Sequence, residues 1–270
     1  MKKVILLLTA ALLPFAAGAQ TVELGARASA GVDYKIMKGL HIQAEEEIRA
    51  GSDALSNLRT TVGLTYKPVS WLKIGAGYVL INPYKTNKEL DDGTLYTGFW
   101  APRHRVYADL TGYCRAGDFQ FSLKERLQLT HRTGEFNAYQ VTPNLVAVKS
   151  RIGVKYRGWK HFVPGVSAEL RVALNNPTLG TLGEAGVTKS GKAYYEYTPA
   201  GYGTPDLDRL RLNLGGEIKF NKHHSLTPYV LADFCSDYEI DTNSEGNRLF
   251  SAVYNRYTFL SAGLSYVFSF

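Results

Sequence analysis

The carboxyl end of the chain, residues 260–270, reads LSAGLSYVFSF. Apolar side chains recur at every second position from Leu260 to the terminal Phe270, and serine or glycine occupies most of the positions between them. A period of two is typical of a β-strand with one apolar face. Because the same alternation recurs along the chain, this end predicts the closing strand of an outer-membrane β-barrel.

The amino end predicts export from the cytoplasm. Two lysines precede the apolar run 4–15 and the small residues 17–19, which is the pattern of a signal peptide. Cleavage after Ala19 would divide the chain into a signal peptide, residues 1–19, and one barrel domain, residues 20–270. The run is too short for a membrane helix, and no later stretch of about 18 apolar residues occurs, consistent with the mean hydropathy of −0.17.

The charge distribution argues against one further class of protein, and the positions of the cysteines predict no disulfide. The formal charge is +7, and removal of the two lysines of the signal peptide leaves +5, spread along the chain rather than gathered in one stripe. This distribution argues against a nucleic-acid binder. Cys114 and Cys235 fall on distant predicted strands, so we expect them to be unpaired.

Eleven segments alternate with period two, and most reach the 9–11 residues that a tilted strand needs to cross a bilayer. In segment 119–132, for example, Phe121, Leu123 and Leu127 share one face and Lys124 lies on the other. The eleven predicted strands are residues 22–36, 40–50, 57–66, 72–83, 103–116, 119–132, 147–157, 162–174, 207–220, 226–237 and 256–270.

Short and long connections alternate along the chain. Short ones lie near 37–39, 67–71, 117–118, 158–161 and 221–225, and mostly long ones near 51–56, 84–102, 133–146, 175–206 and 238–255. Outer-membrane barrels have short periplasmic turns and long extracellular loops. We therefore predict a transmembrane, antiparallel, up-and-down all-β barrel of ten to twelve strands. An even number, ten or twelve, is expected for bacterial barrels, which puts the first segment, 22–36, in question.

Several short motifs resemble an outer-membrane family catalogued as domain of unknown function 2490. They are Glu45-Glu46-Glu47-Ile48-Arg49, Gly63-Leu64-Thr65-Tyr66-Lys67, Trp71-Leu72-Lys73-Ile74-Gly75-Ala76-Gly77-Tyr78, His104-Arg105 to Asp109-Leu110, Glu125-Arg126-Leu127-Gln128 and Gly263-Leu264-Ser265-Tyr266. The resemblance implies a barrel and no activity. The terminal pattern also resembles the signal read by the barrel-assembly machinery, which implies that machinery as a transient partner.

The lumen-facing register is rich in charge, and its basic residues outnumber its acids. The fifteen basic candidates are Arg27, Arg49, Arg59, Lys73, Arg105, Arg115, Lys124, Arg126, Lys149, Arg151, Lys155, Arg171, Arg209, Arg211 and Lys219. The eight acids are Glu23, Asp33, Glu45, Glu47, Asp109, Glu169, Glu217 and Asp233. Two interpretations stay open: ion pairs that close a narrow interior, or a constricted pore whose surplus cations favour small anionic solutes.

Two histidines are predicted at the outer rim. Pairing across the turn at 117–118 sets His104 opposite His131 in the outward register, with Arg103 and Arg132 beside them. Basic groups at this level can bind lipopolysaccharide phosphates, although solvated side chains would look the same. An alternative is a lipid- or lipopolysaccharide-modifying enzyme that uses this rim. No Gly-x-Ser-x-Gly or His-Glu-x-x-His occurs, so we expect no enzyme, no metal and no cofactor.

Two acids break the outward apolar faces. Glu46 and Glu125 both occupy positions that alternation assigns to lipid. A lipid-facing carboxylate is costly, and a β-bulge would return the side chain to the lumen. We therefore expect a bulge next to each.

Overall fold

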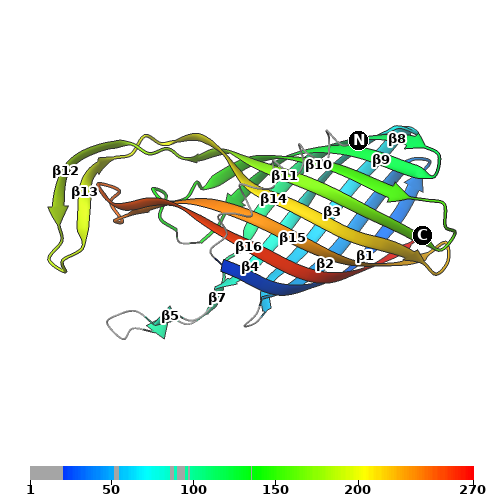
Figure 1. Ribbon diagram of the computed structural model, residues 1–270, viewed down its shortest axis with the longest axis horizontal. Coiled ribbons are helices and arrows are strands. Elements are labelled where there is room, and N and C mark those ends of the chain that lie inside the picture. Colours follow the sequence, from blue (N-terminus) through cyan, green and yellow to red (C-terminus); the bar gives the residue numbers. More distant parts are fainter. Residues whose placement is uncertain (1–20, 52–54, 86–87, 90–94, 97, 135) are drawn as a thin grey trace, which may run out of the picture.

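The computed structural model describes residues 21–270 apart from 52–54, 86–87, 90–94, 97 and 135 (Figure 1). The predicted signal peptide thus lies outside the described residues. Eleven strands form a closed wall. They are β1 (Thr21–Met37), β2 (Leu40–Ala50), β3 (Leu55–Val69), β4 (Leu72–Lys85), β8 (Arg103–Ala116), β9 (Phe119–Arg132), β10 (Asn144–Tyr156), β11 (Phe162–Pro177), β14 (Tyr202–Lys219), β15 (His224–Thr242) and β16 (Arg248–Ser269).

The wall closes through a parallel pair. Successive strands are antiparallel neighbours, but β1 and β16 run in the same direction, from the pair Thr21 and Tyr257 to the pair Asp33 and Ser269. The predicted barrel of ten to twelve strands is confirmed, with eleven strands in the wall; only the expectation of an even number is wrong, and the first segment is a regular wall strand. Small residues line the closing pair, and Ser29 Oγ donates to Ser265 Oγ at 2.8 Å across it. The parallel closure agrees with the odd number of strands. Strand direction alternates around an up-and-down barrel, so the first and last of eleven strands run in the same direction.

The outer face of the wall is apolar and has aromatic rims. Leu123, Leu127 and Ile152 are among many large apolar side chains that are more than half exposed, as expected for a surface covered by lipid. Trp159 lies at a short turn and stacks on Phe162 with ring centroids 5.9 Å apart. No helix in the described part of the chain is long and apolar enough to cross a membrane.

Two of the short turns contain a glycine with positive φ. Gly39 and Gly117 adopt φ values of 80° and 58°, which side chains with a Cβ rarely tolerate. At Gly39 a Cβ would also lie 2.6 Å from the carbonyl oxygen of Lys67. These tight turns hold neighbouring strands at one end of the barrel.

The other end extends far beyond the wall (Figure 1). Residues 175–206, predicted as a loop, contain the hairpin β12 (Thr181–Val187) and β13 (Ala193–Thr198), and β13 pairs with the start of β16. Tyr197, Ile240 and Leu249 form a small buried cluster beneath it. The predicted long loop 238–255 is also mostly strand. The short strands β5 (Lys88–Glu89), β6 (Leu95–Tyr96) and β7 (Phe99–Trp100) belong to the connection after β4.

Both unpaired cysteines are confirmed, and both predicted bulges are wrong. Cys114 is exposed and Cys235 is buried, without a disulfide between them. The registers on both sides of Glu46 and Glu125 run without a shift at either position. Both carboxylates therefore stay on the outer face. Ser150 Oγ donates to Glu125 at 2.6 Å, which partly offsets the cost of that placement.

Glu46 offers a test of this outward orientation. It lies near the middle of β2 and is exposed. We expect Glu46→Leu to raise the free energy of unfolding in phosphatidylcholine vesicles by about 1 kcal/mol, because a lipid-facing charge is removed. Urea titration followed by tryptophan fluorescence measures this change. Glu184→Leu, in the exposed β12 strand, is the control; a loss of stability for Glu46→Leu would contradict the lipid-facing assignment.

Candidate functional site: the charged lumen

The structure places many of the predicted lumen candidates on the inner face of the wall. Pairing sets Arg105 beside Val79 and Thr130, and Lys149 beside Arg126 and Arg171, all on the inner face. Because side chains alternate along each strand, the other candidates on these strands follow the same register. The lumen candidates placed by direct contacts or cavity lining are Arg27, Arg49, Arg59, Lys73, Arg105, Lys124, Arg126, Lys149, Lys155, Arg151, Arg171, Arg211, Asp33, Glu45, Glu47, Asp109, Glu169, Glu217 and Asp233.

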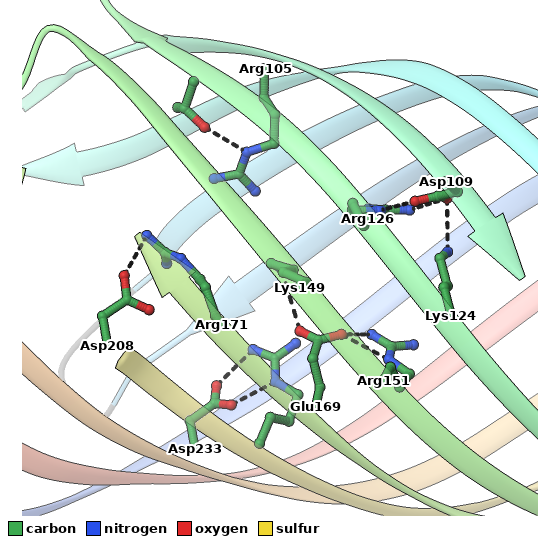
Figure 2. A network of polar contacts seen from close by, with 12 residues as sticks. Arg105, Asp109, Lys124, Arg126, Lys149, Arg151, Glu169, Arg171, Asp208 and Asp233 are labelled. Atoms are coloured by element: carbon green, nitrogen blue, oxygen red, sulfur yellow. Dashed lines mark hydrogen bonds and ion pairs between the residues drawn. The ribbon is translucent and has the colours of Figure 1, made fainter. Parts of the chain in front are cut away.

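Three carboxylates each bridge two cations in the lumen, and Figure 2 shows the units at Asp109 and Glu169. Asp109 lies 2.8 Å from Lys124 Nζ and accepts two hydrogen bonds from Arg126, at 2.5 and 2.7 Å. Glu169 contacts the side chains of both Lys149, at 3.4 Å, and Arg151. Each such unit of one acid and two bases keeps a net charge of +1.

The third unit crosses the closing seam of the barrel. Asp233 on β15 accepts two hydrogen bonds from Arg211, at 2.6 and 2.7 Å, and one from Arg27 at 3.2 Å. Arg27 comes from β1, and its guanidinium passes over the ring of Phe259 on β16 at 5.7 Å. Gly263 stands opposite Arg27, and the ring of Tyr229 occupies the space that a Cβ of Gly263 would need. Both Arg27 and Asp233 are almost completely buried.

Most ion pairs join neighbouring strands and follow the wall. Asp109 and its partners lie on β8 and β9, and Glu169 and its partners on β10 and β11. Arg49 Nη2 pairs with Glu47, two residues away on β2, at 2.7 Å. Apart from the Arg27 contact, these pairs connect adjacent or identical strands, so they coat the inner surface rather than bridge it from side to side.

One member of the network escapes the sequence pattern. Asp208 falls on the predicted outward face of its segment, yet it is buried and lies 3.1 Å from Arg171. A register shift explains this: Arg171 pairs with Arg209 and Val172 with Leu207, so Asp208 is the extra residue of a bulge. The extra residue of a bulge interrupts the regular alternation of side chains between the two faces of the sheet. The only sequence signal is an acid among apolar outward positions, the same signal that misleads at Glu46.

Two cavities remain inside the lined lumen. The first, of about 430 Å³, is bordered by Arg49, Arg59 and Arg105 among others, and the second, of about 410 Å³, by Lys73 and further residues toward the short turns. Arg151 borders both cavities, and its side chain is 43% exposed although it pairs with Glu169. Arg151 thus stands at the boundary between the two spaces.

The structure divides the predicted rim cluster. His104 and His131 are opposite each other and exposed on the outer face. Arg103 and Arg132, which also pair with each other, are the next residues along the strands and therefore turn inward. The four side chains do not form one outward site.

The contacts of the two histidines differ. Nδ1 of His104 lies 2.6 Å from the hydroxyl of Tyr78, and Nδ1 of His131 lies 2.8 Å from Asn144 Oδ1. Among the described residues, these hydrogen bonds give neither histidine an acid or a serine as partner. A base oriented by an acid beside a nucleophile is the usual arrangement for hydrolysis. The enzyme alternative gains no support from this geometry.

The connections at the outer end are fastened to each other. Asn137 Nδ2, between β9 and β10, donates to the carbonyl oxygens of Thr242 and Asn243 at 3.5 and 3.1 Å. Gln140 Nε2 donates to Asp241 at 3.2 Å, and the hydroxyl of Tyr202 donates to the carbonyl of Ala138. The connection 133–143 is therefore tied to the turn between β15 and β16.

Comparison with known proteins gives a limited result. No family model matches the chain and no curated protein matches it, so membership of domain of unknown function 2490 stays a prediction. Among solved structures, the outer-membrane expressed OmpT of Vibrio cholerae is similar at 11% identity, with 84% of each chain covered and a TM-score of 0.35. The closed wall, the apolar outer face and the charged lumen carry the conclusion themselves. The protein is a closed β-barrel whose apolar outer face is suited to a membrane.

Proposed function

We propose that this barrel is a narrow pore that favours small anions. The observation that carries the proposal is the composition of the lumen: each of Asp109, Glu169 and Asp233 is shared by two cations, and further arginines have no acidic partner among the described residues. Surplus basic groups in a constriction attract anions and repel cations. Anions entering from either side would therefore meet a favourable potential.

The alternative is a structural barrel closed by its ion pairs. Eight-stranded barrels fill with side chains, whereas barrels of 16–18 strands leave a channel. Eleven strands lie between these cases, and the pairs follow the wall around two cavities. Arg151, on the border of both, is the side chain whose movement would join them. The pore is the better supported of the two functions.

Recordings in planar bilayers test the proposal. In asymmetric KCl, refolded protein is expected to give single-channel steps, with a reversal potential that reports preference for chloride over potassium. The physical reason is the unbalanced positive charge of the lumen. Faster migration of unboiled than of boiled protein on an SDS gel shows that the protein is folded. If such folded protein gives no single-channel steps, the pore is rejected and the closed structural barrel is the remaining function.

We infer the partners from the outer surface. Outer-membrane lipids cover the apolar wall, and His104 and His131 face the lipopolysaccharide at the outer rim. The exposed aromatic Phe270 at the end of β16 fits recognition by the barrel-assembly machinery during insertion. Export would depend on the signal peptide predicted over residues 1–19.

A further inference from the structure

Three lumen arginines form no close ion pair with a carboxylate within the described residues. Nε of Arg59 donates to Asn57 Oδ1 at 3.3 Å, and Nε of Arg105 donates to Thr130 Oγ1 at 2.9 Å. Nε of Arg209 is buried and has no hydrogen-bond partner in the described structure. The neutral oxygens bond to Arg59 and Arg105 without neutralising their charges, whereas the carboxylates of Asp208 and Asp233 act on Arg209, and that of Glu47 on Arg59, without a close ion pair. We call these three residues, Arg59, Arg105 and Arg209, the arginine cluster.

The cluster brings together side chains from separate parts of the wall. Arg59 comes from β3, Arg105 from β8 and Arg209 from β14. The three charges act on one another: those of Arg105 and Arg209 act on Arg59, and that of Arg209 acts on Arg105. Like charges held this close repel each other, and a bound anion removes that repulsion.

A cavity of suitable size adjoins the cluster. Arg59 and Arg105 line the space of about 430 Å³, together with Arg49, Lys149 and the ring of Tyr107. A water molecule takes roughly 30 Å³ in the liquid, so this cavity can hold a small solute with part of its hydration shell. Arg126 stacks over Tyr107 at 3.8 Å and pairs with Asp109, so its charge is already compensated.

We propose that the arginine cluster is a binding site for a dissolved anion that carries a phosphate group with two or more charges. The planar fork of each guanidinium presents paired N–H donors that match phosphate oxygens. Three arginines that lack a close ion pair favour a multivalent anion over chloride. Because the cluster faces the lumen, the ligand is a dissolved solute rather than a lipid headgroup. The inference rests on the proposed function for an open entrance and names the class of solute that the lumen selects.

Calorimetric titration of folded full-length protein with inorganic pyrophosphate tests the site. We expect saturable binding to the unmodified protein that weakens steeply with added KCl. Arg59→Gln, Arg105→Gln and Arg209→Gln are each expected to weaken it about tenfold or more, since each removes charged donors. Lys73→Gln is the matched control, because Lys73 is a lumen cation that lines the other cavity. The affinity of this variant for pyrophosphate should differ from that of the unmodified protein by less than about threefold.

A conservative variant guards against misfolding. Arg105→Lys keeps the positive charge and loses the fork, so it should fold and still bind pyrophosphate severalfold more weakly than the unmodified protein. A second titration, with a short-chain phosphatidic acid below its critical micelle concentration, tests whether the site binds a lipid headgroup instead. Binding of that lipid without binding of pyrophosphate would overturn the assignment to a dissolved solute.

The outcomes separate this site from the pore itself. Single-channel steps with anion preference but no saturable pyrophosphate binding would reject the site and leave the pore. Saturable binding without steps would reject the pore and support the site. If Arg105→Gln and Lys73→Gln lose pyrophosphate affinity equally, the binding reflects a general attraction of anions by the basic lumen. That result would overturn the proposal.

Discussion

Replacing Asp233 by Asn is expected to lower the free energy of unfolding by about 3–5 kcal/mol. The carboxylate holds Arg27 and Arg211, and the side chains of Asp233 and Arg27 are 5% and 4% exposed. Removing one partner of a buried ion pair leaves the other charge uncompensated, which accounts for a loss of this size. The contact also joins β1 to β15 across the closing seam. Urea titration in detergent micelles, read by heat-modifiable gel migration, measures the loss.

A matched variant and a double variant make this prediction specific. Asp241 pairs with Lys192 at 2.9 Å, but the two side chains are 43% and 56% exposed; Asp241→Asn should cost about 0–1 kcal/mol. Adding Arg27→Gln to Asp233→Asn should restore part of the stability, because one stranded charge is removed. Similar losses for the two single variants would show that burial of the seam pair contributes little.

Strand periodicity predicts much of the wall because two local signals agree there. The bounds of β8 and β9 match the predicted segments 103–116 and 119–132, since alternation covers the strands and a positive-φ glycine marks the turn between them. The outer parts of β15 and β16 were predicted as a loop. Acids at Glu239 and Asp241 are typical of loops, and these strands continue above the wall because they pair with each other.

Non-local contacts account for what the sequence could not show. The partner of β1 lies at the other end of the chain, and no residue pattern in either strand indicates a parallel seam. For the same reason, the contact of Arg27 with Asp233 could not be foreseen. The lumen register was predictable residue by residue, but the sharing of one acid by two bases depends on which strands are neighbours. The inward turn of Asp208 depends on a register shift with β11.

Ion selectivity should respond most strongly to charge reversal at Arg105. This residue lines the lumen cavity of about 430 Å³ and has no acidic partner among the described residues. Arg105→Glu changes the local charge by two units. At about 6 Å in a water-like dielectric, two unit charges alter the energy of a passing monovalent ion by about 1.4 kcal/mol, which is about tenfold in relative permeability. Chloride permeability should fall and potassium permeability should rise by about that factor each, so the ratio of chloride to potassium permeability should fall about a hundredfold.

The control for this reversal is a change of equal charge outside the lumen. Lys189 lies in the turn of the β12–β13 hairpin and is exposed. Lys189→Glu also shifts the charge by two units, but screening beyond about 8–10 Å at moderate salt should leave the reversal potential nearly unchanged. If Arg105→Glu forms folded channels with unaltered selectivity, permeating ions do not pass the arginine cluster. In that case the basic lumen stabilises the wall, and the route for anions lies elsewhere.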